Sequence, residues 1–193
     1  MADSRFRILI VCTGNICRSP AAELLLTAEF ADLAVTDRFS VSSAGTHAMT
    51  GWPISSPMDE LLADRGISGD RFVARQATAS MLAESDLILT ATRQHRTWIT
   101  ATEPRTLRRA FTLTEFADAV RAHDDSDTEP AALVAWASAN RPTSERAVAP
   151  IRRGYAAGDI LDPYGRGDAA YVASLNQIAP LTETIATALT RTA

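Results

Sequence analysis

The chain of 193 residues contains no lysine, and all 19 of its basic side chains are arginine. Without lysine it cannot form a Schiff base with a carbonyl substrate or with pyridoxal phosphate. It also lacks the lysine that protein kinases and P-loop nucleotidases place on the phosphates of their nucleotide. These enzyme classes are therefore excluded, and the formal net charge of −4 argues against a nucleic-acid partner.

Cysteine is scarce too, because Cys12 and Cys17 are the only two in the chain. One pair cannot build a disulfide scaffold, which predicts a reducing compartment and hence a cytoplasmic protein. No apolar run approaches the roughly 18 residues that a membrane span needs, and the run from Ile8 to Val11 is too short for the core of a signal peptide. We therefore expect no membrane insertion.

Hydrophobic residues make up 46% of the chain, enough for one buried core, and their spacing alternates between that of strands and that of helices. The pattern predicts strands at residues 6–12, 39–44, 87–90 and 109–113. It predicts helices at residues 21–30, 57–65, 78–83 and 92–100, followed by helices only, at residues 114–122, 131–140 and 169–189. Alternation of this kind is typical of α/β proteins, and we expect a doubly wound parallel sheet of four strands flanked by helices.

The loop between the first strand and the first helix carries the most informative residues. Cys12 and Arg18 stand at its two ends, with five residues between them. Loop amides and the helix dipole together favour an anion here, and Gly14 and Asn15 permit the tight backbone. The Arg18 guanidinium is a planar fork that can hold two oxygens of a tetrahedral oxyanion.

The same surroundings favour the thiolate of Cys12, because helix N-termini and nearby cations lower the pKa of a thiol. Ser19 has two interpretations: its hydroxyl donates to the thiolate, or it caps the helix. From the residues alone, Cys12 is also compatible with a small buried apolar residue at the end of a strand.

The segment Val11–Pro20, VCTGNICRSP, closely resembles the phosphate-binding loop of the low-molecular-weight protein tyrosine phosphatase family. Three further segments match the family in the same order: Ser42–Thr46 (SSAGT), Ala74–Gln76 (ARQ) and Asp162–Tyr164 (DPY). The resemblance covers residues 6–113 and about 159–190.

The resemblance implies a phosphomonoesterase that needs neither metal nor cofactor, most simply a protein tyrosine phosphatase. Cys12 would attack phosphorus and Asp162 would serve as general acid and then as general base. The phosphate would bind to Arg18 and to the rest of the loop, namely Thr13, Gly14, Asn15, Ile16, Cys17 and Ser19. The substrate would be a phosphorylated protein or a small aryl phosphate, with a tyrosine kinase as partner. By itself Asp162 would be an ordinary turn residue, and Asp159 is a competing carboxylate.

Further positions follow from the resemblance. Asn15 and Ser43 would hold the loop in shape, although Phe72 replaces a histidine that joins this network in many relatives. Cys17 would form a reversible disulfide with Cys12 on oxidation, or would be an inert packing residue. The pocket walls would be Met49, Trp52 and Tyr164, and they differ enough from the family pattern that phosphotyrosine specificity is less secure than phosphatase chemistry.

We expect one domain over residues 1–193 with an insertion at about 114–158 relative to the family. This insertion either packs beside the pocket, as a lid or docking surface, or is a plain pair of helices. The histidines His47, His95 and His123 have no metal-ligand spacing, so we interpret them as surface or loop residues and expect no metal site.

Two alternative functions remain. An arsenate reductase would use the same loop, but without a third cysteine it would need an external thiol. A non-catalytic binder of phosphorylated ligands would be expected to have lost Cys12 or the acid. Both residues are present, which favours the phosphatase.

Overall fold

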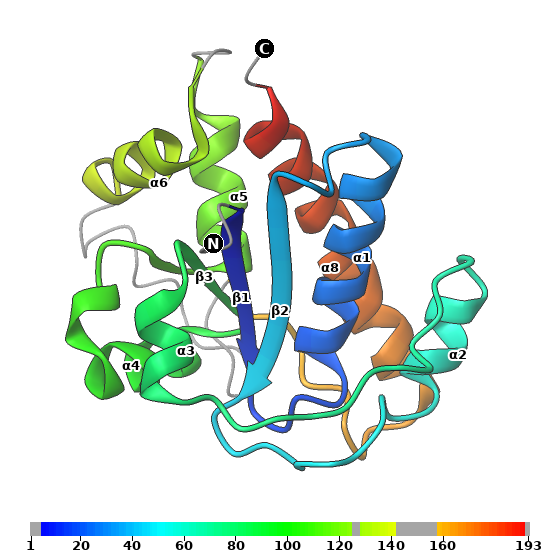
Figure 1. Ribbon diagram of the computed structural model, residues 1–193. Helices are drawn as coiled ribbons and strands as arrows, with labels where there is room; N and C mark the ends of the chain where they lie inside the picture. The colour runs from blue at the N-terminus through cyan, green and yellow to red at the C-terminus, as the bar shows by residue number, and fades with distance from the viewer. Residues whose placement is uncertain (1–4, 125–127, 142–157, 192–193) are drawn as a thin grey trace.

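The computed structural model describes residues 5–124, 128–141 and 158–191, and its centre is a parallel sheet of four strands (Figure 1). The strands are β1 (Phe6–Cys12), β2 (Phe39–Gly45), β3 (Leu87–Thr90) and β4 (Ala110–Thr112). Their order across the sheet is β2-β1-β3-β4, and every neighbouring pair is parallel. The predicted doubly wound α/β sheet is confirmed.

Strand β1 lies at the point where the chain changes its direction of winding. Its partner β2 lies on one side, and β3 lies on the other. In open α/β sheets the loops that follow the strands at such a point diverge and leave a crevice for a ligand. The loop after Cys12 opens at this crevice, so the fold itself brings that segment to the usual binding position.

Helices cover both faces of the sheet (Figure 1). One face carries α1 (Arg18–Asp32), α5 (Leu113–Arg121) and α8 (Asp168–Thr190), and the other carries α3 (Ala79–Glu84) and α4 (Arg93–Thr102). Side chains of β1 alternate between the two layers: Ile8 and Ile10 belong to the first core, and Leu9 and Val11 to the second. The short helix α2 (Met58–Ala63) borders α1 and α8.

Helix α1 begins at Arg18, three residues earlier than predicted. Pro20 misled the prediction, but proline is tolerated in the first turn of a helix because the amide it lacks has no partner there. Arg18 is therefore the first residue of the helix, and its side chain starts beside the loop.

Helix α5 belongs to the first core, the larger one, which it shares with α1 and α8. It packs against α8 and buries Phe116, Ala117 and Val120, and Thr112 and Glu115 form a capping box at its start. This part of the expected insertion is therefore built into the fold.

Helix α6 (Pro130–Ala139) lies at the opposite end of the sheet from the Cys12 loop (Figure 1). Pro130 lines a hollow with Phe6 and Phe39, the first residues of β1 and β2, whereas the loop follows the last residue of β1. Helix α6 is therefore no lid over the pocket. Residues 125–127 and 142–157 of the expected insertion lie outside the described residues.

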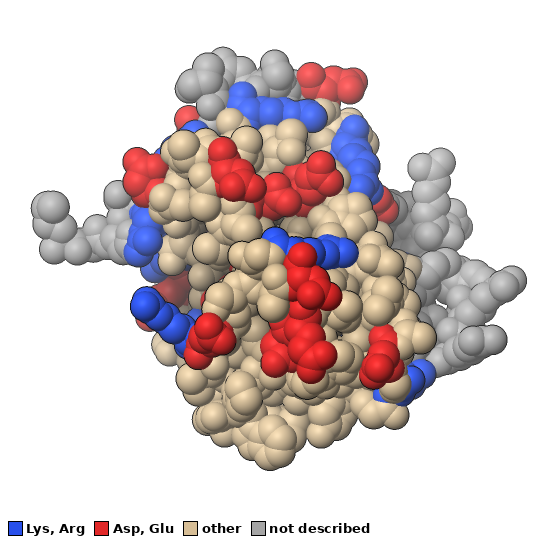
Figure 2. All heavy atoms as spheres, turned by 90° about the vertical axis from the view of Figure 1, so that its right-hand side faces the viewer, with Lys and Arg blue, Asp and Glu red and all other residues tan. Residues whose placement is uncertain are grey.

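Acidic side chains gather on the face formed by α1, α2 and α8 (Figure 2). Glu29, Asp32 and Glu183 line a groove of about 590 Å³ there. Burial, and then the charges of Glu183 and Asp32, raise the pKa of Glu29. This surface would repel a nucleic-acid backbone. None of the described helices is long and apolar enough to span a bilayer.

Candidate active site

The loop from Cys12 to Arg18 is held by the segment that follows β2. The amides of Thr46, His47 and Met49 donate to the carbonyls of Cys12, Thr13 and Gly14 at 2.9, 3.0 and 2.9 Å. In a trans peptide the N–H points away from the C=O. The loop carbonyls therefore face this segment, and the amides of the same peptide units face the inside of the loop, as an anion site requires.

Gly45 makes this close approach feasible. A Cβ atom built on Gly45 would lie 2.4 Å from the carbonyl oxygen of Thr13 and 3.0 Å from Ala48. Any side chain at this position would push the two segments apart. The sequence motif thus includes a glycine whose use only the structure explains.

Asn15 is the internal brace of the loop. Its backbone has φ 56°, the left-handed region that asparagine tolerates, and the residue is fully buried. Its side-chain amide donates to Ser19 Oγ at 2.9 Å and to Ser43 Oγ at 2.8 Å, and its Oδ1 accepts from the amide of Arg75 at 2.9 Å. Asn15 therefore links the loop to Ser43 and to Arg75 by hydrogen bonds, while the effect of these bonds on activity stays a prediction.

Glu23 completes the brace, and sequence reasoning missed it. Ser43 Oγ donates to Glu23 Oε2 at 2.5 Å. Burial raises the pKa of Glu23, while the Ser43 hydrogen bond and the Arg75 charge oppose that rise. Phe72, which takes the place of the family histidine, packs against the first core instead. The network under the loop thus ends on a carboxyl group of α1.

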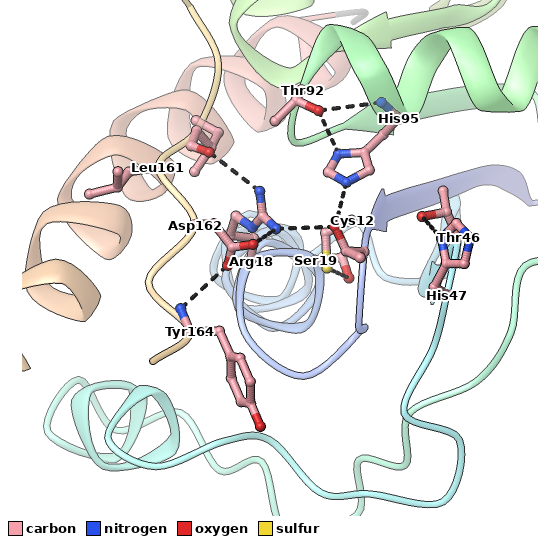
Figure 3. Close-up of polar contacts among 12 residues, drawn as sticks. Cys12, Arg18, Ser19, Thr46, His47, Thr92, His95, Leu161, Asp162 and Tyr164 are labelled. Carbon is pink, nitrogen blue, oxygen red and sulfur yellow. Dashed lines mark hydrogen bonds and ion pairs between the residues drawn. The ribbon is translucent and has the colours of Figure 1, made fainter. Parts of the chain in front are cut away.

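Cys12 and Ser19 lie in contact inside the loop. The distance between Cys12 Sγ and Ser19 Oγ is 3.0 Å (Figure 3). Ser19 Oγ accepts from Asn15, and its own proton has two acceptors within reach: the Cys12 sulfur at 3.0 Å and the carbonyl oxygen of Ala44 at 3.5 Å. Helix α1 has Cys17 as its N-cap and no side-chain cap bond. Of the two interpretations of Ser19, the structure supports the contact with Cys12.

Cys17 has a different environment from Cys12. It is buried, and that burial, followed by the nearby Cys12, raises the pKa of its thiol to about 12, against a hydrogen bond from Tyr171 that lowers it. Cys17 therefore stays a neutral thiol at physiological pH. Its role in a disulfide stays a prediction.

Arg18 projects into the loop and is 3% exposed. Its Nη2 contacts Asp162 Oδ2 at 2.6 Å and Thr13 Oγ1 at 3.4 Å, and its Nη1 contacts the carbonyl of Ile160 at 3.5 Å. Its Nε is buried and has no hydrogen-bond partner in the part of the chain that the structure describes. A buried donor without a partner is costly, and an oxyanion held by the fork would satisfy it.

Asp162 reaches the site from a loop that is distant in sequence (Figure 3). Its carboxylate is 34% exposed and pairs with Arg18. The competing carboxylate of Asp159 turns elsewhere: its Oδ1 accepts from the amide of Arg93, at the start of α4, at 2.9 Å. Of the two candidates, Asp162 is the one that lies beside the Arg18 fork.

His95 corrects one of our predictions. It is not a surface or loop residue, because it lies in α4, is 6% exposed, and places its Nε2 2.8 Å from Thr13 Oγ1. Its Nδ1 lies 2.8 Å from Thr92 Oγ1. A signal existed in the sequence, since His95 follows closely the carboxyl end of the third predicted strand, where the loops of a parallel sheet converge. The other histidines differ, because His47 is exposed and His123 packs its ring on Trp136.

The three predicted wall residues differ in how they lie relative to the loop. A Cβ built on Gly14 would lie 3.8 Å from Met49 Cγ, so Met49 borders the loop directly. Trp52 is 55% exposed and Tyr164 is 53% exposed, and Figure 3 places Tyr164 on the Asp162 side of the site. Their contact with a substrate stays a prediction.

Comparison with known proteins places the chain in a family. The sequence model of the low molecular weight phosphotyrosine protein phosphatases matches residues 7–133. The chain belongs to this family. It is therefore a phosphatase of the low-molecular-weight type, and the four-stranded sheet is the fold of that family.

Relatives and solved structures agree with this assignment. The low molecular weight protein-tyrosine-phosphatase Etp of Escherichia coli K12 is 37% identical over 105 residues, which are 54% of this chain and 67% of Etp. The crystal structure of the Erwinia amylovora tyrosine phosphatase AmsI has 25% identity and a TM-score of 0.68, covering 96% of this chain and 94% of that one. The YwlE arginine phosphatase of Geobacillus stearothermophilus has 26% identity and a TM-score of 0.67, with 94% and 90% covered.

Proposed function

We propose that this phosphatase hydrolyses phosphotyrosine in proteins through a cysteinyl phosphate on Cys12. The convergence of Cys12, Arg18 and Asp162 carries the proposal. Arg18 pairs with Asp162 through Nη2, and its buried Nε has no hydrogen-bond partner among the described residues. Phosphoryl oxygens entering the loop would take the carboxylate's place on the fork and satisfy Nε, which leaves Asp162 facing the leaving oxygen.

In the first step the thiolate of Cys12 forms a bond to phosphorus, and the bond from phosphorus to the leaving phenolic oxygen breaks. Asp162 gives its proton to that oxygen, so that a neutral phenol departs. Arg18 and the loop amides hold the three remaining oxygens, whose charge they balance throughout the transfer. A positioned acid contributes typically 10²–10⁴-fold to such a step.

In the second step Asp162, now a carboxylate, takes a proton from water. The water oxygen bonds to phosphorus, the bond from phosphorus to sulfur breaks, and Cys12 returns as a thiolate. Inorganic phosphate leaves, and Asp162 is again protonated for the next cycle. No metal enters either step, because the positive charge comes from Arg18 and the loop amides.

The substrate class follows from the relatives and from the site. The matched relatives are protein-tyrosine phosphatases by name, and two of the similar solved structures are arginine phosphatases by name. The exposed rings of Trp52 and Tyr164 favour an aryl phosphate, since aromatic rings attract one another. A tyrosine kinase would supply such a substrate. With only Cys12 and Cys17 in the chain, arsenate reduction would still need an external thiol.

Steady-state kinetics of the full chain with phosphotyrosine, phosphoserine and phosphoarginine peptides, and with arsenate and a thiol, test the proposal. We expect the largest kcat/KM for phosphotyrosine and no loss of rate with a metal chelator. Turnover that depends on arsenate or on a divalent ion would contradict it, and a preference for phosphoarginine would move the substrate class.

The Cys12→Ser variant tests the covalent step. We expect a folded protein, by circular dichroism, whose turnover falls by roughly 10⁴-fold or more. Acid quenching during turnover of labelled phosphotyrosine should trap label on the native protein and none on Cys12→Ser. A variant with near-native turnover would show that Cys12 is not the nucleophile.

A further inference from the structure

We propose that His95 is a positioning residue for this phosphatase: it holds the Thr13 hydroxyl, and through that hydroxyl the Arg18 fork, in place for phosphate. The inference rests on the proposed function. It assigns a task to a buried polar group that the two chemical steps do not use.

The contacts form a continuous path from α4 to the phosphate fork (Figure 3). Thr92 Oγ1 lies 2.8 Å from His95 Nδ1, His95 Nε2 lies 2.8 Å from Thr13 Oγ1, and Thr13 Oγ1 accepts from Arg18 Nη2 at 3.4 Å. Each of these atoms therefore has a partner on both sides, except at the Arg18 end, where the substrate binds.

One nitrogen of the neutral imidazole donates and the other accepts. Arg18 can only donate, so Thr13 Oγ1 accepts from it. With the ring proton on Nδ1, His95 donates to Thr92 Oγ1 and accepts the Thr13 proton at Nε2; with the proton on Nε2, it donates to Thr13 Oγ1, so either tautomer holds that hydroxyl. Only a neutral imidazole can accept at one nitrogen and donate at the other.

The surroundings keep the ring neutral and in place. Burial, and then the positive charges of Arg18 and His47, lower the pKa of His95 to about 3. Thr92 also caps α4, because its Oγ1 accepts from the amide of His95 at 3.3 Å. The imidazole is therefore fixed by a helix end while its far nitrogen supports the loop.

Thr13 connects His95 to Arg18 in this path. It is exposed, and it lies beside Cys12 in the loop. Without His95 its hydroxyl could rotate towards solvent and leave Arg18 Nη2 with Asp162 as its remaining partner. Small displacements of a group that binds the reacting atoms are costly, since about 1 Å can reduce a rate by roughly 10²-fold.

A double-mutant cycle separates this role from a general effect on folding. We would measure kcat, KM and inhibition by inorganic phosphate for Thr13→Val, His95→Phe and the combined variant. We expect each single change to lower kcat/KM and to weaken phosphate inhibition about tenfold. Because both act through one hydroxyl, the combined variant should match Thr13→Val within about threefold.

Two other variants sharpen the cycle. His95→Gln keeps a polar group within reach of Thr13 and should recover most of the loss. His123→Phe removes a histidine remote from the loop while keeping an aromatic ring against Trp136, and it should behave like the native protein. If His95→Phe does not unfold cooperatively, the comparison uses Thr13→Val and His95→Gln instead. Thr13 is exposed, so Thr13→Val should leave the core unchanged, and its loss of phosphate inhibition then measures the role of the hydroxyl.

Losses that multiply to about 100-fold in the combined variant would overturn the inference, because they would mean independent roles. Unchanged phosphate inhibition in His95→Phe would also overturn it. Cys12→Ser in the same assay separates the two proposals: an active Cys12→Ser refutes the proposed function, whereas an inactive one with a multiplicative cycle refutes only the role of His95.

Discussion

The loop from Cys12 to Arg18 (the cysteine loop) and the loop that carries Asp162 and Tyr164 (the acid loop) meet at Arg18, but they are built differently. Cys12, Asn15 and Ser19 are at most 2% exposed, and amides from the segment after β2 hold the loop carbonyls in place. In the acid loop Asp162 is 34% exposed at its side chain and Tyr164 is 53% exposed.

The acid loop is anchored mainly at its beginning. The amide of Ile160 donates to the carbonyl of Ala91 at 2.8 Å, and the amide of Leu161 donates to Gln177 Oε1 at 2.9 Å. Asp162, further along, pairs with Arg18, the group that the substrate is expected to occupy. The comparison indicates a rigid anion site and an acid whose carboxylate can exchange its partner.

The largest effect after loss of the nucleophile should come from Arg18→Lys, which removes the guanidinium fork from the cysteine loop. An ammonium cannot present two parallel donors to one oxyanion. We expect kcat to fall roughly 10²–10³-fold and vanadate inhibition to weaken by a comparable factor. Unchanged vanadate affinity would show that the fork does not bind the phosphoryl group.

Asp162→Asn tests the other side of the comparison, the general acid. For a phenol of high pKa we expect kcat to fall about 10²-fold, because that leaving oxygen needs a proton. For an activated nitrophenol the loss should be only a few-fold. Asp159→Asn is the matched control: its amide oxygen can still accept from Arg93, and its effect should not depend on the leaving group. Equal losses in both variants would mean that neither carboxyl group is the acid.

Ser43→Ala loosens the brace under the cysteine loop. Asn15 loses one acceptor and Glu23 loses a hydrogen bond, so we expect about a tenfold loss of kcat/KM with both leaving groups. The pKa of Glu23, already raised by burial, should rise further. A raised carboxyl pKa means that stability is lost as pH rises through the folded-state value. Urea unfolding at pH 5 and pH 7 should therefore show a steeper decline for Ser43→Ala than for the native chain.

Gln177→Ala should have the smallest effect, because it removes one partly exposed hydrogen bond to Leu161. We expect kcat to fall about threefold, and only with the poor leaving group. A loss as large as that of Ser43→Ala, or one shared by both substrates, would show that the acid loop is as rigid as the cysteine loop.

The sequence predicted most of the sheet because the hydrophobic pattern of each strand is local. The continuous apolar run before Cys12 predicts a buried strand, and the motif after it predicts an anion loop. Asn15, Ser43 and Asp162 could be named from the family resemblance. The start of α1 was missed because Pro20 hid the helix beginning at Arg18.

The residues that the sequence did not reveal make contacts across the fold. Glu23, in α1, contacts Ser43, and His95 contacts Thr13 although the two lie 82 positions apart in the sequence. No spacing of residues along the chain predicts either contact, because both depend on how α1 and α4 pack against the sheet. The described helices of the expected insertion differ in their position. Helix α5 is part of the core, and α6 lies at the end of the sheet opposite to the Cys12 loop.

Gly45 shows that a position can govern catalysis while carrying no side chain. A methyl group there would press on the carbonyl of Thr13, and Thr13 stands between Cys12 and the contacts of Arg18. The sheet could form as before, yet the nucleophile and its anion site would be out of alignment. A screen that scores activity alone would rank position 45 with the reactive groups. A parallel measurement of folding would show that the protein still folds, and that activity is lost because a side chain fills the space next to the Thr13 carbonyl.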